Sequence, residues 1–364
     1  MRTWLVILLL LPSGSFAQAI LKGKVIAADS KQPLPVVNVY ISNTSVGTLT
    51  DEAGRFIIDR FPPGRYEVVV SCIGYEPYTV VLQSGQLPSE LFVSLKPKIN
   101  ELQEVIVEPY LKDGWERWGV YFMENVIGTS AFAADCKLKN HEVLKFRYDK
   151  KQNILKVYAD EPLVLENHAL GYMLKYTMVR CEFNHTTHVE YYQGYPLFIA
   201  MESRNKRQMM RWERNRTEAY YGSMMHFMRS LFRNHILEEG FEVRKLIRKK
   251  NEKADMLINT LLTGDSIAYA IDSVTAGFRF DDHLQVIYKY KTVPDEFVKR
   301  NFGTNRKSPQ VSDITMTDKE EIAISANGSY WPSLTILTSG YWGWSEKLAT
   351  MLPYDYEPPS LKIQ

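Results

Sequence analysis

Short hydrophobic runs and turn residues alternate along the first quarter of the chain, between Gly23 and Leu95. Asp51-Glu52-Ala53-Gly54 has the composition of a tight turn, because the Asp side chain can accept from backbone N–H groups and Gly54 can adopt a positive φ. β-branched and aromatic runs follow each such turn. The pattern predicts a small β-sandwich of about seven strands. Its expected interior residues are Phe56, Val68, Val70 and Cys72.

The order of the turn and strand motifs in this segment resembles a known family. The residues that carry the resemblance are Gly23-Lys-Val25, Pro33-Leu34, Val37-Asn-Val39, Gly47-Thr48, Thr50 to Phe56, Pro63 to Tyr66, and Gly74-Tyr75. They are similar to the carboxypeptidase regulatory-like domain, a transthyretin-like sandwich, over residues 20–96. The resemblance implies an accessory module without catalytic residues. Such modules stand behind metallocarboxypeptidases and at the front of TonB-dependent outer-membrane receptors.

The first seventeen residues have the features of a signal peptide. Arg2 gives a positive start, residues 4–11 form a short apolar stretch, and Ser15-Phe16-Ala17 is a small-x-small cleavage site. The mature chain is therefore expected to begin at Gln18, without a cysteine for lipidation and without a later run of eighteen apolar residues. We expect export to the periplasm or the outer-membrane surface, with peripheral membrane contact at most.

Beyond the sandwich, residues 98–135 are expected to form a connecting strand and helix, and residues 136–364 a β-rich α+β domain. The strip Leu102 to Val107 resembles a segment with which TonB-dependent receptors contact their energy-coupling protein, and it also fits an ordinary connecting strand. Aromatic residues between Lys112 and Ala134 recur at helical spacing, which favours core packing. The whole chain is thus predicted to be mainly β.

One long amphipathic helix is expected from Asn215 to Glu239. Asn215 and Glu218 fit a capping box, and Gly240 fits the end of the helix. Its apolar face favours burial against a sheet, although a membrane or a partner groove could also receive it. The residues expected to be buried are Tyr221, Met224, Met228 and Phe232. A polar loop is expected at residues 297–317, and residues 341–359 are expected to lie as a tail on a surface.

The sequence contains no complete catalytic motif. His235-Ile-Leu-Glu238 matches the short part of a zinc carboxypeptidase motif, but it falls near the end of the predicted helix, and His283 follows too soon to be the second ligand of that family. His185 and His188 fit a polar hairpin loop better than a metal pair. No HExxH, GxSxG, P-loop or GxGxxG string occurs. We therefore assign no catalytic, cofactor-binding or metal-binding residue, and the chain is predicted not to be an enzyme.

The charged residues indicate which partners the chain could bind, and the cysteines indicate whether it could form a disulfide. The 44 basic and 42 acidic side chains nearly cancel, which argues against a nucleic-acid partner. Of the three cysteines, Cys72 is expected to be free, whereas Cys136 and Cys181 are either bridged or two isolated thiols. Two basic runs, Arg204 to Arg216 and Arg244 to Lys253, form either solvated faces or a site for anionic lipid head groups.

These observations predict an exported, non-catalytic binding or assembly protein of the cell envelope, with an envelope protein or a glycan as its partner. A carbohydrate-binding accessory protein is the first alternative, since exposed tyrosines can stack on sugar rings. Its candidate residues are Tyr40, Tyr66, Tyr75 and Tyr78. A zinc-dependent peptidase is the second alternative.

Overall fold

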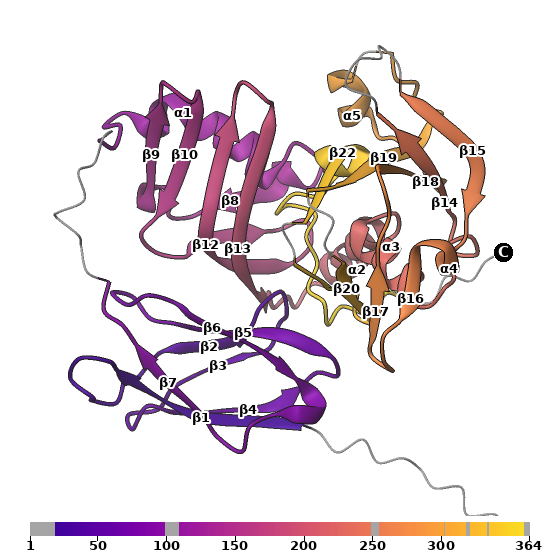
Figure 1. Cartoon of the computed structure of the whole chain (residues 1–364). Coiled ribbons are helices and arrows are strands. Elements are labelled where there is room, and N and C mark those ends of the chain that lie inside the picture. The colour runs from indigo at the N-terminus through magenta and orange to yellow at the C-terminus, as the bar shows by residue number, and fades with distance from the viewer. Residues whose placement is uncertain are drawn as a thin grey trace, which may run out of the picture.

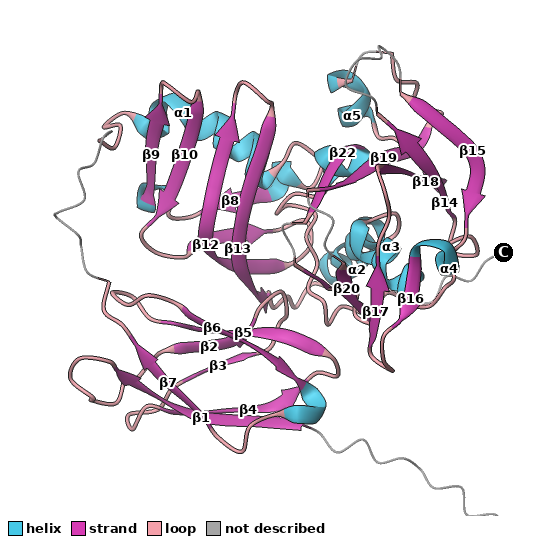
Figure 2. Cartoon of the chain, viewed as in Figure 1, coloured by secondary structure: helices cyan, strands magenta, loops and turns pink. Residues whose placement is uncertain are grey.

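The computed structural model describes residues 19–98, 109–248, 255–301, 303–317, 321–332 and 335–359. The predicted signal peptide and the strip Leu102 to Val107 lie outside these residues. The described chain is mainly β, as predicted, and its strands form five sheets around three buried clusters (Figures 1 and 2). No helix in the described ranges is long and apolar enough to cross a bilayer.

The N-terminal sandwich has the predicted seven strands. They are β1 (Ala19–Ala27), β2 (Asn38–Ile41), β3 (Gly47–Leu49), β4 (Arg55–Phe61), β5 (Arg65–Ser71), β6 (Tyr78–Gln83) and β7 (Leu91–Leu95). Two sheets, β4-β1-β7 and β3-β2-β5-β6, enclose one apolar core. Phe56, Val68 and Val70 lie inside it, whereas Cys72 follows β5 and is half-buried against the core. The predicted interior is therefore confirmed for Phe56, Val68 and Val70, and only in part for Cys72.

The second unit is a six-stranded antiparallel sheet covered by a helix. Its elements are α1 (Gly114–Phe122), η2 (Met123–Ile127), η3 (Ala133–Asp135), β8 (Cys136–Leu138), η4 (His141–Val143), β9 (Leu144–Asp149), β10 (Ile154–Ala159), β11 (Leu163–Asn167), β12 (Tyr172–Asn184) and β13 (Val189–Ala200). The predicted aromatic stripe packs in this core, with Phe122 fully buried. β13 pairs with β12 along its whole length, from Val189 to Ala200.

In the third unit two sheets pack around one short helix, α3 (Met224–Phe232). Its elements are α2 (Lys206–Tyr220), α3 (Met224–Phe232), β14 (Phe241–Ile247), β15 (Met256–Leu262), α4 (Gly264–Ile267), β16 (Ala268–Ala270), β17 (Thr275–Phe278), β18 (His283–Thr292), α5 (Asp295–Arg300), β19 (Pro309–Met316), β20 (Ile322–Ser325), β21 (Tyr330–Trp331), β22 (Ile336–Gly340) and α6 (Tyr341–Ser345). α3 supplies much of the core between the sheets β15-β14-β18-β19-β22 and β16-β17-β20-β21. The expected polar loop at residues 297–317 is wrong, since α5 and β19 occupy much of it.

The single long helix predicted from Asn215 to Glu239 is also wrong. The chain breaks at Gly222, whose φ is +87°, and a Cβ there would lie 2.7 Å from both Gln310 and Tyr288. Ser223 then caps α3 by accepting from the His226 N–H. Asn215 is not a cap, because it lies inside α2 and its side chain donates to the Ala169 carbonyl.

The expected burial of the helix face is partly confirmed. Met224 and Met228 are buried in the third core. Tyr221 and Phe232, which were expected to be buried with them, are half-buried and pack at the edge of that core. Burial therefore extends along α3 from Met224 to Leu231, and its last residue, Phe232, is only partly buried.

The sandwich is docked on the second unit through its β3-β2-β5-β6 sheet. The Tyr40 hydroxyl lies 3.1 Å from the Thr177 hydroxyl and donates to the Tyr195 carbonyl at 3.1 Å. The Phe198 N–H donates to the Thr44 carbonyl at 3.0 Å, and these segments run side by side in Figure 1. Polar groups of the two units are therefore hydrogen-bonded across this contact. The second unit lies as a further layer behind the β3-β2-β5-β6 sheet of the sandwich.

The C-terminal segment returns to the sandwich, but the expected surface tail at residues 341–359 is wrong for its first part, because Trp342, Leu348 and Ala349 are buried in the cores of the other two units. The Tyr354 N–H donates to the Asn43 carbonyl at 2.6 Å, and Asp355 accepts from the Ser45 N–H at 3.0 Å. On the other side the buried Arg229 guanidinium donates to the carbonyls of Tyr354 and Tyr356, both at 3.0 Å. The tail therefore ties the sandwich to α3.

Candidate ligand-binding cavity

A cavity of about 590 Å³ lies where the three units meet. Asn43 contributes from the sandwich, Tyr192 from β13, Met224 from α3 and Trp342 from α6. Small-molecule sites in proteins commonly have volumes of about 300–1,000 Å³ and lie between domains. The size and the position of this cavity are therefore those of a ligand site.

Among the acidic groups of the cavity wall, Glu346 has the most strongly shifted pKa. One of its carboxylate oxygens, Oε1, accepts from the Met224 N–H at 3.1 Å, at the first residue of α3. Burial raises the pKa of Glu346 to about 7, although this backbone hydrogen bond acts in the opposite direction. The carboxyl group is consequently about half ionised at neutral pH.

The other charged groups of the wall are paired. Lys347 lies 3.2 Å from Glu190 and places its ammonium group 5.5 Å from the centre of the Tyr192 ring. Arg248 is bound by Asp255 at 2.9 Å. Within each pair the two charges neutralise each other, and the ion pair restricts the motion of both side chains.

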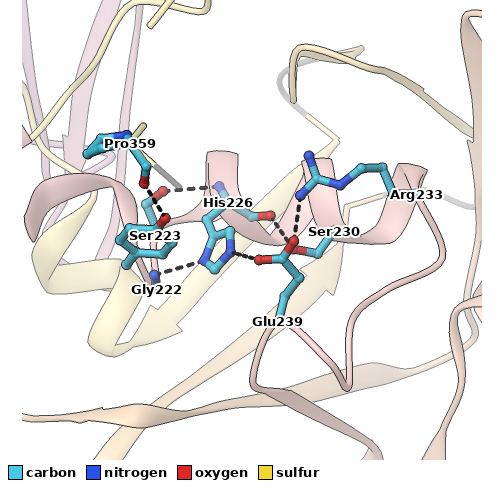
Figure 3. A network of polar contacts seen from close by, with 8 residues as sticks. Gly222, Ser223, His226, Ser230, Arg233, Glu239 and Pro359 are labelled. Carbon is cyan, nitrogen blue, oxygen red and sulfur yellow. Dashed lines mark hydrogen bonds and ion pairs between the residues drawn. The ribbon is translucent and has the colours of Figure 1, made fainter. Parts of the chain in front are cut away.

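A buried polar network lies along α3 (Figure 3). His226 is fully buried, and its Nδ1 accepts from the Gly222 N–H at 3.1 Å. Its Nε2 must therefore carry the proton and donate to Glu239, which lies 2.9 Å away and also accepts from Arg233 at 2.9 Å. Burial lowers the pKa of His226, whereas the hydrogen bond from His226 lowers the pKa of Glu239. Both ring nitrogens are occupied, so this histidine fixes the turn before α3 rather than transferring protons.

The residues of the zinc hypothesis do not form a metal site. His235 and Glu238 are exposed in the turn after α3, and not in a helix as expected. His283 lies on β18, where its Nδ1 is 2.7 Å from the Thr315 hydroxyl. Within the described ranges no group of three or more His, Cys, Asp or Glu side chains could hold a metal ion.

His185 and His188 occupy the hairpin turn between β12 and β13, as predicted. The Asn184 side chain accepts from the backbone N–H groups of Thr186 and Thr187, which shapes the turn. The His185 ring stacks on Trp118, with the ring centroids 5.6 Å apart. His188 is exposed at the rim of the cavity.

All three cysteines are free. Cys136 lies on β8 and Cys181 on β12, and β11 separates these strands in the sheet. Cys136 pairs with Asn167 of β11, which pairs with Tyr172 of β12, nine residues before Cys181. At about 3.3 Å per residue the two cysteines are roughly 30 Å apart along β12, which is too far for a disulfide. Of the two alternatives that the sequence left open, the structure has two isolated thiols, and burial raises the pKa of Cys136 to about 12.

Some of the candidate surface residues are exposed, whereas others are buried or held by contacts within the protein. Arg216 donates to the Leu170 carbonyl at 2.7 Å and lies over the Tyr172 ring, so it is not part of a free basic face. Most of the remaining basic side chains of α2 are exposed, and residues 249–254 lie outside the described ranges. Tyr40 and Tyr66 are buried and unable to stack on a sugar, which leaves Tyr78 as the exposed member of the predicted set.

Glu346, Glu190 and Lys347 were not singled out by the sequence. Glu346 and Lys347 are consecutive, but Glu190 lies more than 150 residues before them, and no motif spacing joins the three. The one local signal is the run Tyr341-Trp-Gly-Trp344 before Glu346, which is rich in aromatic residues and was interpreted as the start of the tail. In the structure the whole of that run lies in the helix α6, and α6 forms part of the cavity wall.

Comparisons with known proteins agree with the sandwich. Residues 21–107 match the family model of the CarboxypepD_reg-like domain. The TonB-dependent receptor P39 of Formosa agariphila is 35% identical over 94 residues, which cover 26% of this chain and 9% of the receptor. This chain thus matches about a tenth of that protein's length.

A solved structure, the 9R-lipoxygenase from Cyanothece PCC8801, aligns with 60% of this chain and 49% of its own at 12% identity. Its TM-score of 0.17 is too low to support an argument about fold or function. The family match and the receptor name no catalytic activity for the matched segment. The N-terminal sandwich of this chain is a carboxypeptidase regulatory-like domain, as the resemblance predicted.

Proposed function

We propose that this chain is a non-catalytic binding protein of the cell envelope and that its ligand occupies the cavity between the three units. The cavity carries the proposal, because its wall joins the regulatory-like sandwich to both larger units. The relationship to a TonB-dependent receptor and the signal-like first seventeen residues support an envelope location. The regulatory-like domain would then act as one wall of a binding site.

The binding test uses a neutral apolar fluorophore, N-phenyl-1-naphthylamine. Thr338 on β22 lines the cavity, so Thr338→Trp should fill part of it. Thr292→Trp at the exposed end of β18 is the matched control. We expect saturable fluorescence enhancement with the wild type and with Thr292→Trp, and a loss of at least about tenfold in affinity with Thr338→Trp. No binding to the wild type, or equal binding to all three proteins, would contradict the proposal.

A glycan ligand is the second candidate, and an adjoining groove favours it. This groove of about 270 Å³ is lined by all three units, shares Tyr192 and Tyr354 with the cavity, and includes Tyr195 and Trp331. Trp331 is 55% exposed, and the Arg65 guanidinium lies 5.6 Å from its ring centre. Aromatic faces with polar neighbours can stack on sugar rings. If Trp331→Ala leaves retention on immobilised envelope polysaccharide unchanged, the glycan candidate fails.

A further inference from the structure

We infer that the cavity between the three units takes an organic cation, with an ammonium group at Glu346 and an apolar body against the aromatic wall. The inference rests on the proposed function, because it names the chemistry of the ligand in the same cavity. It follows from the charges and the aromatic rings of the cavity wall.

The charge balance of the wall leaves one carboxyl group without a counter-ion. Glu190 is paired with Lys347, and Arg248 is held by Asp255, so neither attracts an ionic ligand strongly. Glu346 accepts a hydrogen bond from the Met224 N–H, and no cation is paired with it in the described part of the chain. A ligand with a positive charge or a strong donor would complete its interactions.

Aromatic rings supply the second part of the recognition. Tyr192, Tyr330, Trp342 and Tyr354 all line the cavity. The negative faces of such rings attract ammonium groups, and the Lys347 ammonium already uses the Tyr192 ring in this way. Met224 and other apolar side chains cover the neighbouring wall, where an alkyl or aryl body can be buried.

The position of Glu346 links binding to pH. Its neighbours with ionisable groups are Glu190 and Tyr192 of β13, Tyr330 of β21, Tyr341 of α6, Lys347, Tyr354, and the paired Glu218 and Lys291 of an adjoining cavity of about 200 Å³. Burial raises the pKa values of these tyrosines, so they stay neutral between pH 6 and 8. Glu346, whose pKa is about 7, therefore gains its charge over this range.

The test compares three ligands that share one alkyl chain: 1-octylamine, 1-octanol and octanoate. Each displaces N-phenyl-1-naphthylamine from the full-length protein at pH 8. We expect octylammonium to act at a concentration at least about tenfold lower than octanol, and octanoate to be the weakest. Glu346→Gln keeps an acceptor for the Met224 N–H but removes the charge, so octylammonium and octanol should become equal.

The pH profile is the second measurement. Between pH 8 and pH 6 the ionised fraction of Glu346 falls from about 0.9 to about 0.1, so octylammonium should bind about tenfold more weakly at pH 6. Octanol binding should not change. His188 also lines the cavity, so His188→Gln serves as the control and should retain the wild-type profile.

Three outcomes would overturn the inference: octanoate binding as well as octylammonium, a preference that survives Glu346→Gln, or a flat pH profile. If Glu346→Gln does not fold, the wild-type pH profile and its His188→Gln control decide the matter. Failure of all three compounds to displace the fluorophore would also refute the proposed cavity ligand. Displacement by octanol without any preference for the ammonium group would refute the charge recognition alone.

Discussion

Truncation of Phe227 to alanine tests whether α3 is a core helix or a membrane-binding helix. Phe227 is fully buried, and its ring centroid lies 5.3 Å from that of Phe241 and 5.4 Å from that of Trp342. Large-to-small changes of a buried Phe cost about 3–5 kcal/mol, because transfer energy is lost and a cavity remains. Phe232, at the end of the same helix, is half-buried and should cost only about 1–2 kcal/mol.

The assay is urea unfolding of the full-length protein followed by tryptophan fluorescence, together with co-sedimentation on anionic liposomes. We expect Phe227→Ala to lower the free energy of unfolding by at least about 3 kcal/mol and Phe232→Ala by less than half as much. Liposome binding should not depend on either residue. A loss below about 1 kcal/mol for Phe227→Ala, combined with weaker liposome binding, would refute the core-helix account.

The remaining predictions concern the interfaces, the thiols and pH. Arg229→Met should lower the free energy of unfolding by about 2–4 kcal/mol and speed proteolysis of the C-terminal tail, since buried carbonyls lose their donor. Tyr40→Phe should cost about 1 kcal/mol, measured by urea unfolding, and a cost near zero would argue against the docked sandwich. Thiol titration of the denatured, unreduced protein should find three free cysteines, whereas one would indicate a bridge. The pKa of Glu346 is raised in the folded protein, so the free energy of unfolding of the wild type should fall as the pH rises from about 4.5 to about 7. Glu346→Gln should therefore be more stable than the wild type at pH 8, by up to about 3 kcal/mol, and equally stable at pH 4.

The sandwich could be predicted from the sequence because its determinants are local. The Asp51 carboxylate accepts from the N–H groups of Ala53 and Arg55, and Gly54 has a φ of +72°, as the turn composition indicated. Strand alternation then placed Val68 and Val70 inside. Such signals need only a few neighbouring residues, and they are independent of the rest of the chain.

The helix break and the cavity depend on contacts that are distant in sequence. Helical periodicity continues across Gly222, but Gln310 and Tyr288 leave no room there for a side chain. The pKa of Glu346 rises because distant segments bury it, and Asn43 reaches the same cavity from the sandwich. A single sequence does not reveal which of its segments meet in this way, so the candidate site could not be predicted.

Binding of an organic cation at the junction of the three units can be observed in a crystal structure of the protein with 8-bromooctylammonium, because the anomalous signal of bromine locates the ligand. We predict a bromine peak inside the cavity lined by Tyr192 and Trp342, with the ammonium group within hydrogen-bonding distance of the Glu346 carboxylate. A bromine peak confined to another surface, or an empty cavity at saturating ligand, would contradict the claim.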